Sequence, residues 1–148
     1  MPYSVYLAGP IGGCGKKEAN DWRNDITTKL AEHNIKGISP LRCEPLIGRK
    51  YKKTGYDDIC FGTPQAIGSK NELDVTNCSI TLAYLPTLSP GTLAEIGMAK
   101  GKHKPVIVVT ALPLIKNHPV FVDWADWMLD DLDQAYDVIV GLYGDYAE

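Results

Sequence analysis

A glutamate with the surroundings of a nucleophile lies in the segment 85–99, which reads LPTLSPGTLAEIGMA. Gly91 and Thr92 mark the start of a helix, which places Glu95 in its first turn. One interpretation is a capping box, in which Thr92 caps the helix and Glu95 reaches back to the backbone. The other is chemical, because the helix dipole and free N–H groups would keep the carboxylate ionised with a low pKa. Such a carboxylate at a crevice is suited to attack on an anomeric carbon.

A second candidate segment is the glycine-rich loop that follows the first apolar run and reads GPIGGCGKK. It is not a P-loop, because five residues instead of four separate its first glycine, Gly9, from the pair Gly15-Lys16. Lys17 also stands where a P-loop has its serine or threonine. The glycines instead indicate a backbone that passes close to a ligand, with Gly9, Pro10 and Ile11 in contact with it.

The elements that would position these residues follow from the apolar periodicity. Strands are predicted at 4–8, 37–41, 79–85, 105–110 and 128–129. Helices are predicted from about 17 to 33, from 64 to 77, and at 92–100, 117–124 and 131–142. Thr63 is expected to cap the helix that begins at Pro64, with Ile67 and Leu73 facing inward. The polar segment 42–62 is predicted to be a long functional loop.

Strands that alternate with helices predict an α/β fold, because right-handed crossovers cover both faces of a parallel sheet. We expect a doubly wound, five-stranded sheet of order 2-1-3-4-5 in one domain over residues 1–148. In this order strands 1 and 3 are neighbours whose following loops diverge and open a crevice. The site is therefore predicted between the loops 9–16 and 86–92.

Composition excludes several classes of partner. The formal net charge of −3 argues against a nucleic-acid polymer or an anionic membrane surface, since both require a basic excess. Four scattered cysteines and three isolated histidines show no metal-ligand spacing, so neither a metal nor a cofactor is predicted. With no signal peptide and no long apolar stretch, we expect a cytoplasmic protein that binds a small molecule.

Four motifs together resemble the nucleoside 2-deoxyribosyltransferase family, and the resemblance covers nearly the whole chain. They read YLAGPI from Tyr6, DWR from Asp21, NELDVTNCS from Asn71, and SPGTLAEIG from Ser89. The resemblance implies a flavodoxin-like fold and a homo-oligomer whose subunits share active sites. It also implies that Glu95 forms a covalent deoxyribosyl intermediate and that Tyr6 orients its carboxylate.

The chain departs from the family pattern on the side of the leaving base. Many members have an aspartate where this chain has Asn71, and an amide can bind a base but cannot act as a general acid near pH 7. Asp74, one helical turn later, could take that role, or the base could be protonated through water. Asp74 could equally be a solvated helix residue.

Further positions are candidates for binding the substrate. Ser89 resembles members that act on 5'-monophosphates, because a hydroxyl beside backbone N–H groups suits a phosphate, but Ser-Pro is also ordinary turn chemistry. Arg23 could reach a phosphate or lie in solvent, while Trp22 beside it fits core packing or base stacking. Asp126 is the candidate for a residue that enters the neighbouring subunit's site.

The sequence thus predicts an enzyme that cleaves the N-glycosidic bond of a 2'-deoxynucleoside and transfers the sugar to a second base. The first alternative is a 2'-deoxynucleoside 5'-monophosphate N-glycosidase that uses water as the acceptor. An alternative of another class is a non-catalytic nucleotide-binding sensor on the same fold, favoured by the missing carboxylate at Asn71.

Overall fold

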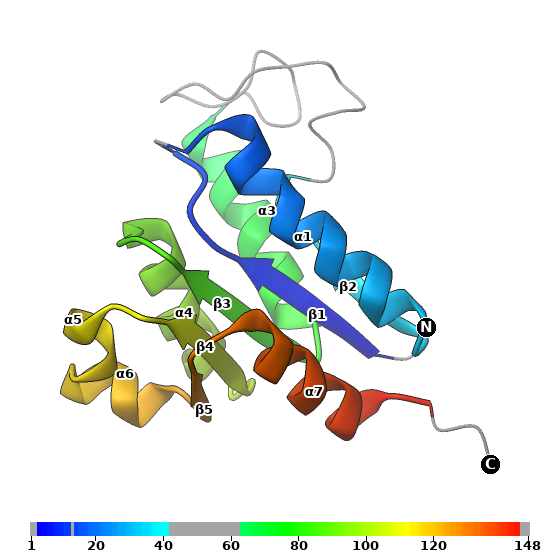
Figure 1. Ribbon diagram of the computed structural model, residues 1–148. Coiled ribbons are helices and arrows are strands. Elements are labelled where there is room, and N and C mark those ends of the chain that lie inside the picture. The colour runs from blue at the N-terminus through cyan, green and yellow to red at the C-terminus, as the bar shows by residue number, and fades with distance from the viewer. Residues whose placement is uncertain (1–2, 13, 42–62, 146–148) are drawn as a thin grey trace.

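Five parallel strands form one sheet in the computed structural model, which describes residues 3–12, 14–41 and 63–145. The strand order is β2-β1-β3-β4-β5, which confirms the predicted 2-1-3-4-5 arrangement. The strands are β1 (Tyr3–Ala8), β2 (Ile35–Ile38), β3 (Ile80–Leu85), β4 (Val106–Thr110) and β5 (Trp127–Leu129). The helices are α1 (Lys16–Ala31), α3 (Pro64–Asn77), α4 (Pro90–Gly101), α5 (Pro113–Lys116), α6 (Pro119–Trp124) and α7 (Leu132–Tyr143). Figure 1 shows their arrangement.

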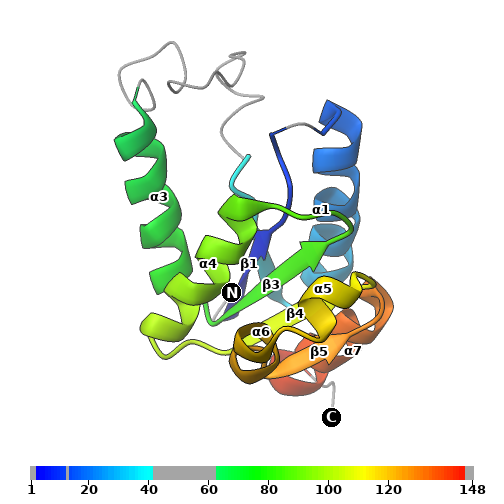
Figure 2. The same cartoon turned by 90° about the vertical axis from the view of Figure 1, so that its left-hand side faces the viewer.

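Helices cover both faces of this sheet, so its central strands carry apolar residues on both sides. All five residues of β4 are buried, as are five of the six in β3. On one face Leu7 and Leu82 pack with Ile26 of α1 and Ile139 of α7. The opposite face packs against α3 and α4 through residues such as Val75 and Ile96. Figure 2 shows α3 and α4 on one side of β1 and β3, with α1 on the other.

This layering opens the sheet at the carboxyl ends of β1 and β3. The two strands are paired in register, with Tyr6 opposite Thr81 and Ala8 opposite Ala83. The chain leaves β1 toward α1 on one face and leaves β3 toward α4 on the other. The loops after the two strands therefore diverge, which is the geometry in which such sheets bind ligands.

Several predicted boundaries were wrong for local reasons. The second strand begins at Ile35, because Asn34 adopts a positive φ of 59° and ends the preceding turn earlier than expected. Gly37 lies inside this strand, where a Cβ would come within 2.5 Å of Thr27 Oγ1. Leu73, expected to face inward, is exposed, and Val75 is the residue of α3 that packs against the sheet.

The predicted start of α3 is confirmed. Thr63 caps α3 as predicted, accepting a hydrogen bond from the Ala66 N–H at 3.1 Å. The predicted loop 42–62 lies outside the described residues. Within the described ranges, no helix combines the length and the apolar character that crossing a bilayer requires.

Candidate active site

Side chains from three elements converge at the carboxyl end of β1. Tyr6 is fully buried in this strand and points to the face covered by α3 and α4. Glu95 of α4 and Asp74 of α3 are close enough to the Tyr6 phenol to raise its pKa, although burial is the larger cause. The fold thus brings together three residues that are separated by up to 89 positions in the sequence (95 − 6 = 89).

Buried polar atoms in this cluster lack hydrogen-bond partners among the described residues. They are the Tyr6 hydroxyl, Glu95 Oε2 and, beside Tyr6 in the sheet register, Thr81 Oγ1. A side-chain interaction between the Tyr6 phenol and the Glu95 carboxyl group contributes to the pKa of both, so the two groups are close neighbours, although the geometry of neither the Tyr6 hydroxyl nor Glu95 Oε2 meets that of a full hydrogen bond. Since buried polar groups are nearly always paired, these atoms indicate a site that awaits a ligand or a small closing movement.

The pKa of Glu95 is raised above its ordinary value, which corrects the prediction of a low pKa. Burial of the carboxyl group is the main cause, and the negative charge of Asp74 adds to it. Interaction with the Tyr6 phenol and the positive charges of Arg23 and Lys70 oppose the rise. The expected effect of the helix dipole fails because it acts mainly on the first turn, and Glu95 lies beyond that turn.

The residue at which α4 begins explains why Glu95 lies beyond the first turn. Ser89, rather than Thr92, is the N-cap, and its Oγ accepts a hydrogen bond from the Thr92 N–H at 3.3 Å. The Thr92 hydroxyl also donates to Ser89 Oγ at 2.9 Å and is itself buried. The helix therefore begins at Pro90, one turn of chain before Glu95, so the predicted capping box with Thr92 is wrong. Ser89 thus has a structural role as the cap of α4, and its contact with a phosphate stays a prediction.

Arg23 is buried and holds the end of β1 against α1. Its Nε donates to the Leu7 carbonyl at 3.0 Å, its Nη2 to the Gly9 carbonyl at 2.9 Å, and its Nη1 to the Ala19 carbonyl. Burial lowers the pKa of Arg23 to about 10, and the nearby Glu95 carboxylate opposes this change, so the guanidinium stays charged at neutral pH. The expectation that Arg23 lies in solvent is therefore wrong, and its donors bind backbone carbonyls.

The first loop passes close to this guanidinium. Gly9 and Pro10 are buried, and Ile11 accepts a hydrogen bond from the Cys14 N–H at 3.2 Å. A Cβ on Gly9 would come within 2.7 Å of the Trp22 ring and 3.1 Å of the Tyr84 carbonyl. Glycine is therefore required at position 9 by close packing, since any other side chain would displace Trp22 or the loop.

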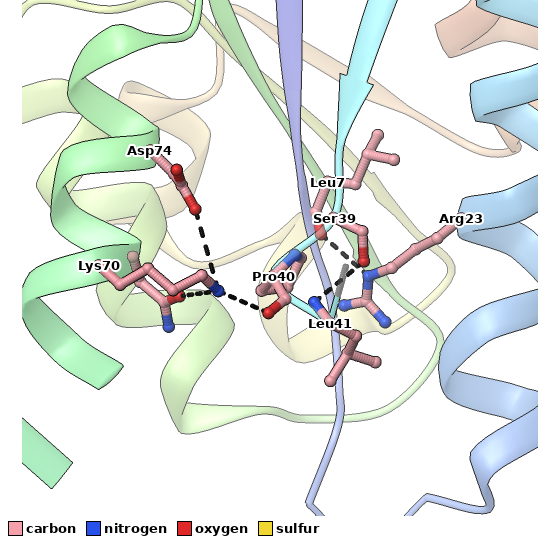
Figure 3. Close-up of polar contacts among 8 residues, drawn as sticks. Leu7, Arg23, Ser39, Pro40, Leu41, Lys70 and Asp74 are labelled. Carbon is pink, nitrogen blue, oxygen red and sulfur yellow. Dashed lines mark hydrogen bonds and ion pairs between the residues drawn. The ribbon is translucent and has the colours of Figure 1, made fainter. Parts of the chain in front are cut away.

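Lys70 lines the opposite side of the site, on α3. Its Nζ donates to the Pro40 carbonyl at 2.6 Å and lies 3.5 Å from Asn71 Oδ1 and 4.0 Å from Asp74 Oδ2. Figure 3 shows Lys70 and Asp74 extending from α3 toward the end of β2, while Arg23 approaches from α1. Asp74 is thus part of a buried charge cluster and not a solvated helix residue, since its side chain is only 12% exposed.

Comparison with known proteins agrees with this arrangement. A family model described as nucleoside 2-deoxyribosyltransferase matches residues 5–135. The chain belongs to the nucleoside 2-deoxyribosyltransferase family. A search of curated protein sequences gives no match.

Solved structures of low sequence identity share the fold. A 2-deoxyribosyltransferase from Bacillus psychrosaccharolyticus is 14% identical with a TM-score of 0.68, over 98% of each chain. A CMP N-glycosidase from Clostridium botulinum is 18% identical with a TM-score of 0.56, over 95% of this chain and 99% of that one. A molybdenum cofactor binding protein from Rippkaea orientalis is 11% identical with a TM-score of 0.65, over 96% and 98%. At these identities the likeness establishes the architecture and not the ligand.

The fold places Asp126, another predicted site residue, at the end of the sheet opposite the crevice. Its Oδ2 accepts a hydrogen bond from the Val106 N–H at 2.8 Å and pairs with Lys100 at 3.3 Å. Val106 begins β4, so Asp126 lies at the amino ends of β4 and β5, opposite the crevice. A contribution of Asp126 to a neighbouring subunit's site stays a prediction.

A surface hollow of about 210 Å³ lies elsewhere, between α1 and α7, with Trp22 and Tyr136 in its lining. Trp22, for which core packing and base stacking were both considered, is the one sequence candidate in its lining, and Glu95, Tyr6 and Asp74 do not line it. Among the described residues, no group of three or more histidine, cysteine, aspartate or glutamate side chains is placed to hold a metal ion.

One contributor to the site, Lys70, escaped sequence reasoning. Lys70 is a lysine in a polar helix, and only its i,i+4 spacing from Asp74 links it to a candidate residue. Arg23 was identified from its motif, yet two of its three carbonyl partners, Leu7 and Gly9, lie on β1 and the first loop, whose approach to α1 depends on the fold.

Proposed function

We propose that this family member cleaves the N-glycosidic bond of 2'-deoxynucleosides through a covalent deoxyribosyl intermediate on Glu95. The observation that carries the proposal is the pair of unpartnered buried atoms, Glu95 Oε2 and the Tyr6 hydroxyl, at the carboxyl ends of β1 and β3. A carboxylate beside a phenol in a dry crevice has the chemistry needed to attack an anomeric carbon.

The reaction then runs in two displacements at one carbon. A Glu95 carboxylate oxygen forms a bond to C1', the C1'–N bond breaks, and its electron pair leaves with the base, which takes up a proton. The nitrogen of a second base next attacks C1', releases Glu95 and loses a proton, so the configuration is retained overall. Tyr6 would hold the carboxylate in position by donating its O–H to the oxygen that does not attack.

A product assay tests this proposal. Purified protein is mixed with deoxynucleosides and a second free base, and chromatography measures base release and exchange. Glu95→Gln is expected to abolish exchange, whereas Glu72→Gln, which changes an exposed glutamate of α3, is expected to leave it unchanged. Acid-quenched protein should gain the mass of one deoxyribosyl group on Glu95.

Two results would contradict the proposal. Full exchange activity in Glu95→Gln would remove the nucleophile from the mechanism. Tight nucleotide binding without turnover of any substrate would instead favour the non-catalytic sensor.

Hydrolysis of 5'-monophosphates is the second candidate, because of the hydroxyl at the start of α4. Ser89 Oγ accepts both bonds from Thr92, so its own proton can be donated to a ligand oxygen. A phosphate at this helix start would also gain from the helix dipole. The fold shared with a CMP N-glycosidase from Clostridium botulinum favours this candidate.

Ser89→Asp separates the two candidates. Aspartate is a good N-cap, so α4 keeps its start, but its charge repels a phosphate. If 5'-monophosphates are the substrates, their hydrolysis should fall at least about tenfold, an effect of about 1.4 kcal/mol. Wild-type release of base from deoxynucleosides alone, unaffected by Ser89→Asp, would assign the transferase activity instead.

The assembly and location complete the proposal. We infer a cytoplasmic homo-oligomer that acts on a small-molecule deoxynucleoside or deoxynucleotide and a free base, without a metal or another cofactor.

A further inference from the structure

The ammonium of Lys70 is largely buried, and a buried charge needs hydrogen-bond or ion-pair partners. Its side chain is only 16% exposed. Removing a lysine ammonium from water is costly unless hydrogen bonds and opposite charges compensate it. Its shortest contact is the 2.6 Å hydrogen bond to the Pro40 carbonyl, at the carboxyl end of β2.

A tight turn presents this carbonyl to Lys70. The Leu41 N–H donates to Ser39 Oγ at 3.1 Å, so the chain bends around Pro40, and the Leu41 side chain is buried. Figure 3 shows Lys70 reaching across from α3 to this turn. The contact therefore joins α3 to the end of β2. This strand pairs with β1, and β1 carries Tyr6.

The same ammonium lies beside the Asp74 carboxylate, and its charge acts on Glu95. Asp74 Oδ2 lies 4.0 Å from Lys70 Nζ, and the charge of Lys70 also acts on Glu95 and opposes the rise in its pKa. The other groups that act on Glu95 are Tyr6 from β1, Arg23 from α1 and Asp74 from α3. Lys70 is thus the cation on the α3 side, matching Arg23 on the α1 side.

We propose that Lys70 is a positioning residue of the Glu95 site, whose ammonium fixes the end of β2 against α3 and balances the carboxylates of Asp74 and Glu95. The inference rests on the proposed function for its catalytic consequence, but its electrostatic part concerns the protein alone. Without this charge, burial and the neighbouring Asp74 would act on Glu95, and among the described residues Arg23 and Tyr6 would remain to oppose them.

Lys70 also orients the amide of Asn71. An ammonium only donates hydrogen bonds, so the Asn71 side chain must turn its oxygen toward Lys70, as the 3.5 Å contact shows. Its NH₂ group then stays a donor for whatever binds beside it. A ligand atom bound by this NH₂ group would therefore be a hydrogen-bond acceptor, such as a carbonyl oxygen or an unprotonated ring nitrogen of a base.

The test compares Lys70→Met, Lys70→Arg and the control Lys102→Met, which removes a second lysine paired to α3, at its exposed contact with Glu72. The pH profile of kcat/KM for base release is measured for each protein. A carbon-13 NMR titration of the Glu95 carboxyl group measures its pKa directly, and circular dichroism confirms folding.

We expect Lys70→Met to shift the midpoint of the acidic limb of the profile to higher pH by about one unit. At pH values below that midpoint, kcat/KM should fall about tenfold. The direction follows because a lost positive charge disfavours the ionised carboxylate, so a higher pH is needed to form it. Lys70→Arg should restore the midpoint, and Lys102→Met should match the wild type.

An unchanged midpoint in a folded Lys70→Met protein would overturn the inference, as would an equal loss of activity at every pH. If the wild type releases no base from any substrate, the proposed function fails. The NMR titration then still decides the role of Lys70, since a raised pKa of Glu95 in Lys70→Met supports it and an unaltered pKa refutes it.

Discussion

At the scale of single residues, the candidate site contains buried polar atoms that lower the stability of the fold. The Tyr6 hydroxyl and Glu95 Oε2 are buried without partners among the described residues, which costs free energy of folding. Such costs are usual where a protein must hold groups ready for a reaction. Substitutions that remove the polar atoms should therefore weaken activity and leave the fold intact or more stable.

Tyr6→Phe is the clearest example. We expect kcat to fall about 10- to 100-fold, since one hydrogen bond to a charged group is worth about 1.5–3 kcal/mol. The free energy of unfolding should be unchanged or rise by up to about 1 kcal/mol, because the lost hydroxyl was unpaired. Urea titration and initial rates measure the two effects. A marked loss of stability would show that the hydroxyl has a structural partner.

The pH dependence of the wild type follows from the raised pKa of Glu95. A nucleophilic carboxylate must be ionised, so activity is present above this pKa and lost as the pH falls through it. The midpoint of the acidic limb of kcat/KM should therefore lie above the ordinary glutamate value of about 4.3.

Stability has the opposite dependence on pH. The folded state binds the Glu95 proton more tightly than the unfolded state, so this group favours folding most at low pH. That contribution is lost as the pH rises from the ordinary value toward the raised one. Glu95→Gln should thus unfold at a higher temperature than the wild type at pH 7. A lower melting temperature would contradict the direction of the shift.

At the scale of elements, Arg23 determines how β1 ends and α1 begins. One guanidinium binds carbonyls from Leu7, Gly9 and Ala19, and its face lies 4.7 Å from the centroid of the Trp22 ring. A lysine at this position would keep the charge but could not present donors in the same planar fork. The helix and the first loop therefore depend on arginine specifically.

Arg23→Lys is expected to lower the free energy of unfolding by about 2–4 kcal/mol, because buried carbonyls would lose their donors. Lys29→Met on the same helix removes an exposed ion pair with Asp133 and should cost at most about 1 kcal/mol. Chemical denaturation of both variants measures the difference. Similar small losses in both would mean that the first loop is held by other contacts.

At the scale of the whole molecule, exposed apolar side chains gather on the two short helices after β4. Leu114 of α5 and Val120 and Val122 of α6 are all exposed in the single chain. Exposed apolar side chains on neighbouring helices are typical of a protein interface. It is consistent with the homo-oligomer that the family resemblance implies.

We expect light scattering to give at least twice the mass of one chain. Val122→Glu should lower that mass if α6 lies in the interface, because an interface that buries an unpaired charge is strongly destabilised. Leu142→Glu, at an exposed apolar position of α7, is the matched control. A fully active monomer would contradict the assembly and the sharing of sites between subunits.

Sequence alone determined the architecture and the main candidate residue. The alternation of strand and helix patterns predicted the order 2-1-3-4-5, and the crevice position followed from that order. Local signals such as the Thr63 cap could be predicted because they depend on neighbouring residues. The motif around Glu95 identified the family, although its helix begins earlier than predicted.

Only the tertiary structure decided the state and surroundings of Glu95. Its pKa is set by burial together with Tyr6, Arg23, Lys70 and Asp74, which come from three other elements. The partners of Lys70 and Arg23 likewise include backbone carbonyls at strand ends distant in sequence. Periodicity and capping are properties of neighbouring residues, whereas burial and charge balance depend on which distant segments meet. For that reason the sequence could single out Glu95 as the candidate nucleophile but predicted its pKa in the wrong direction.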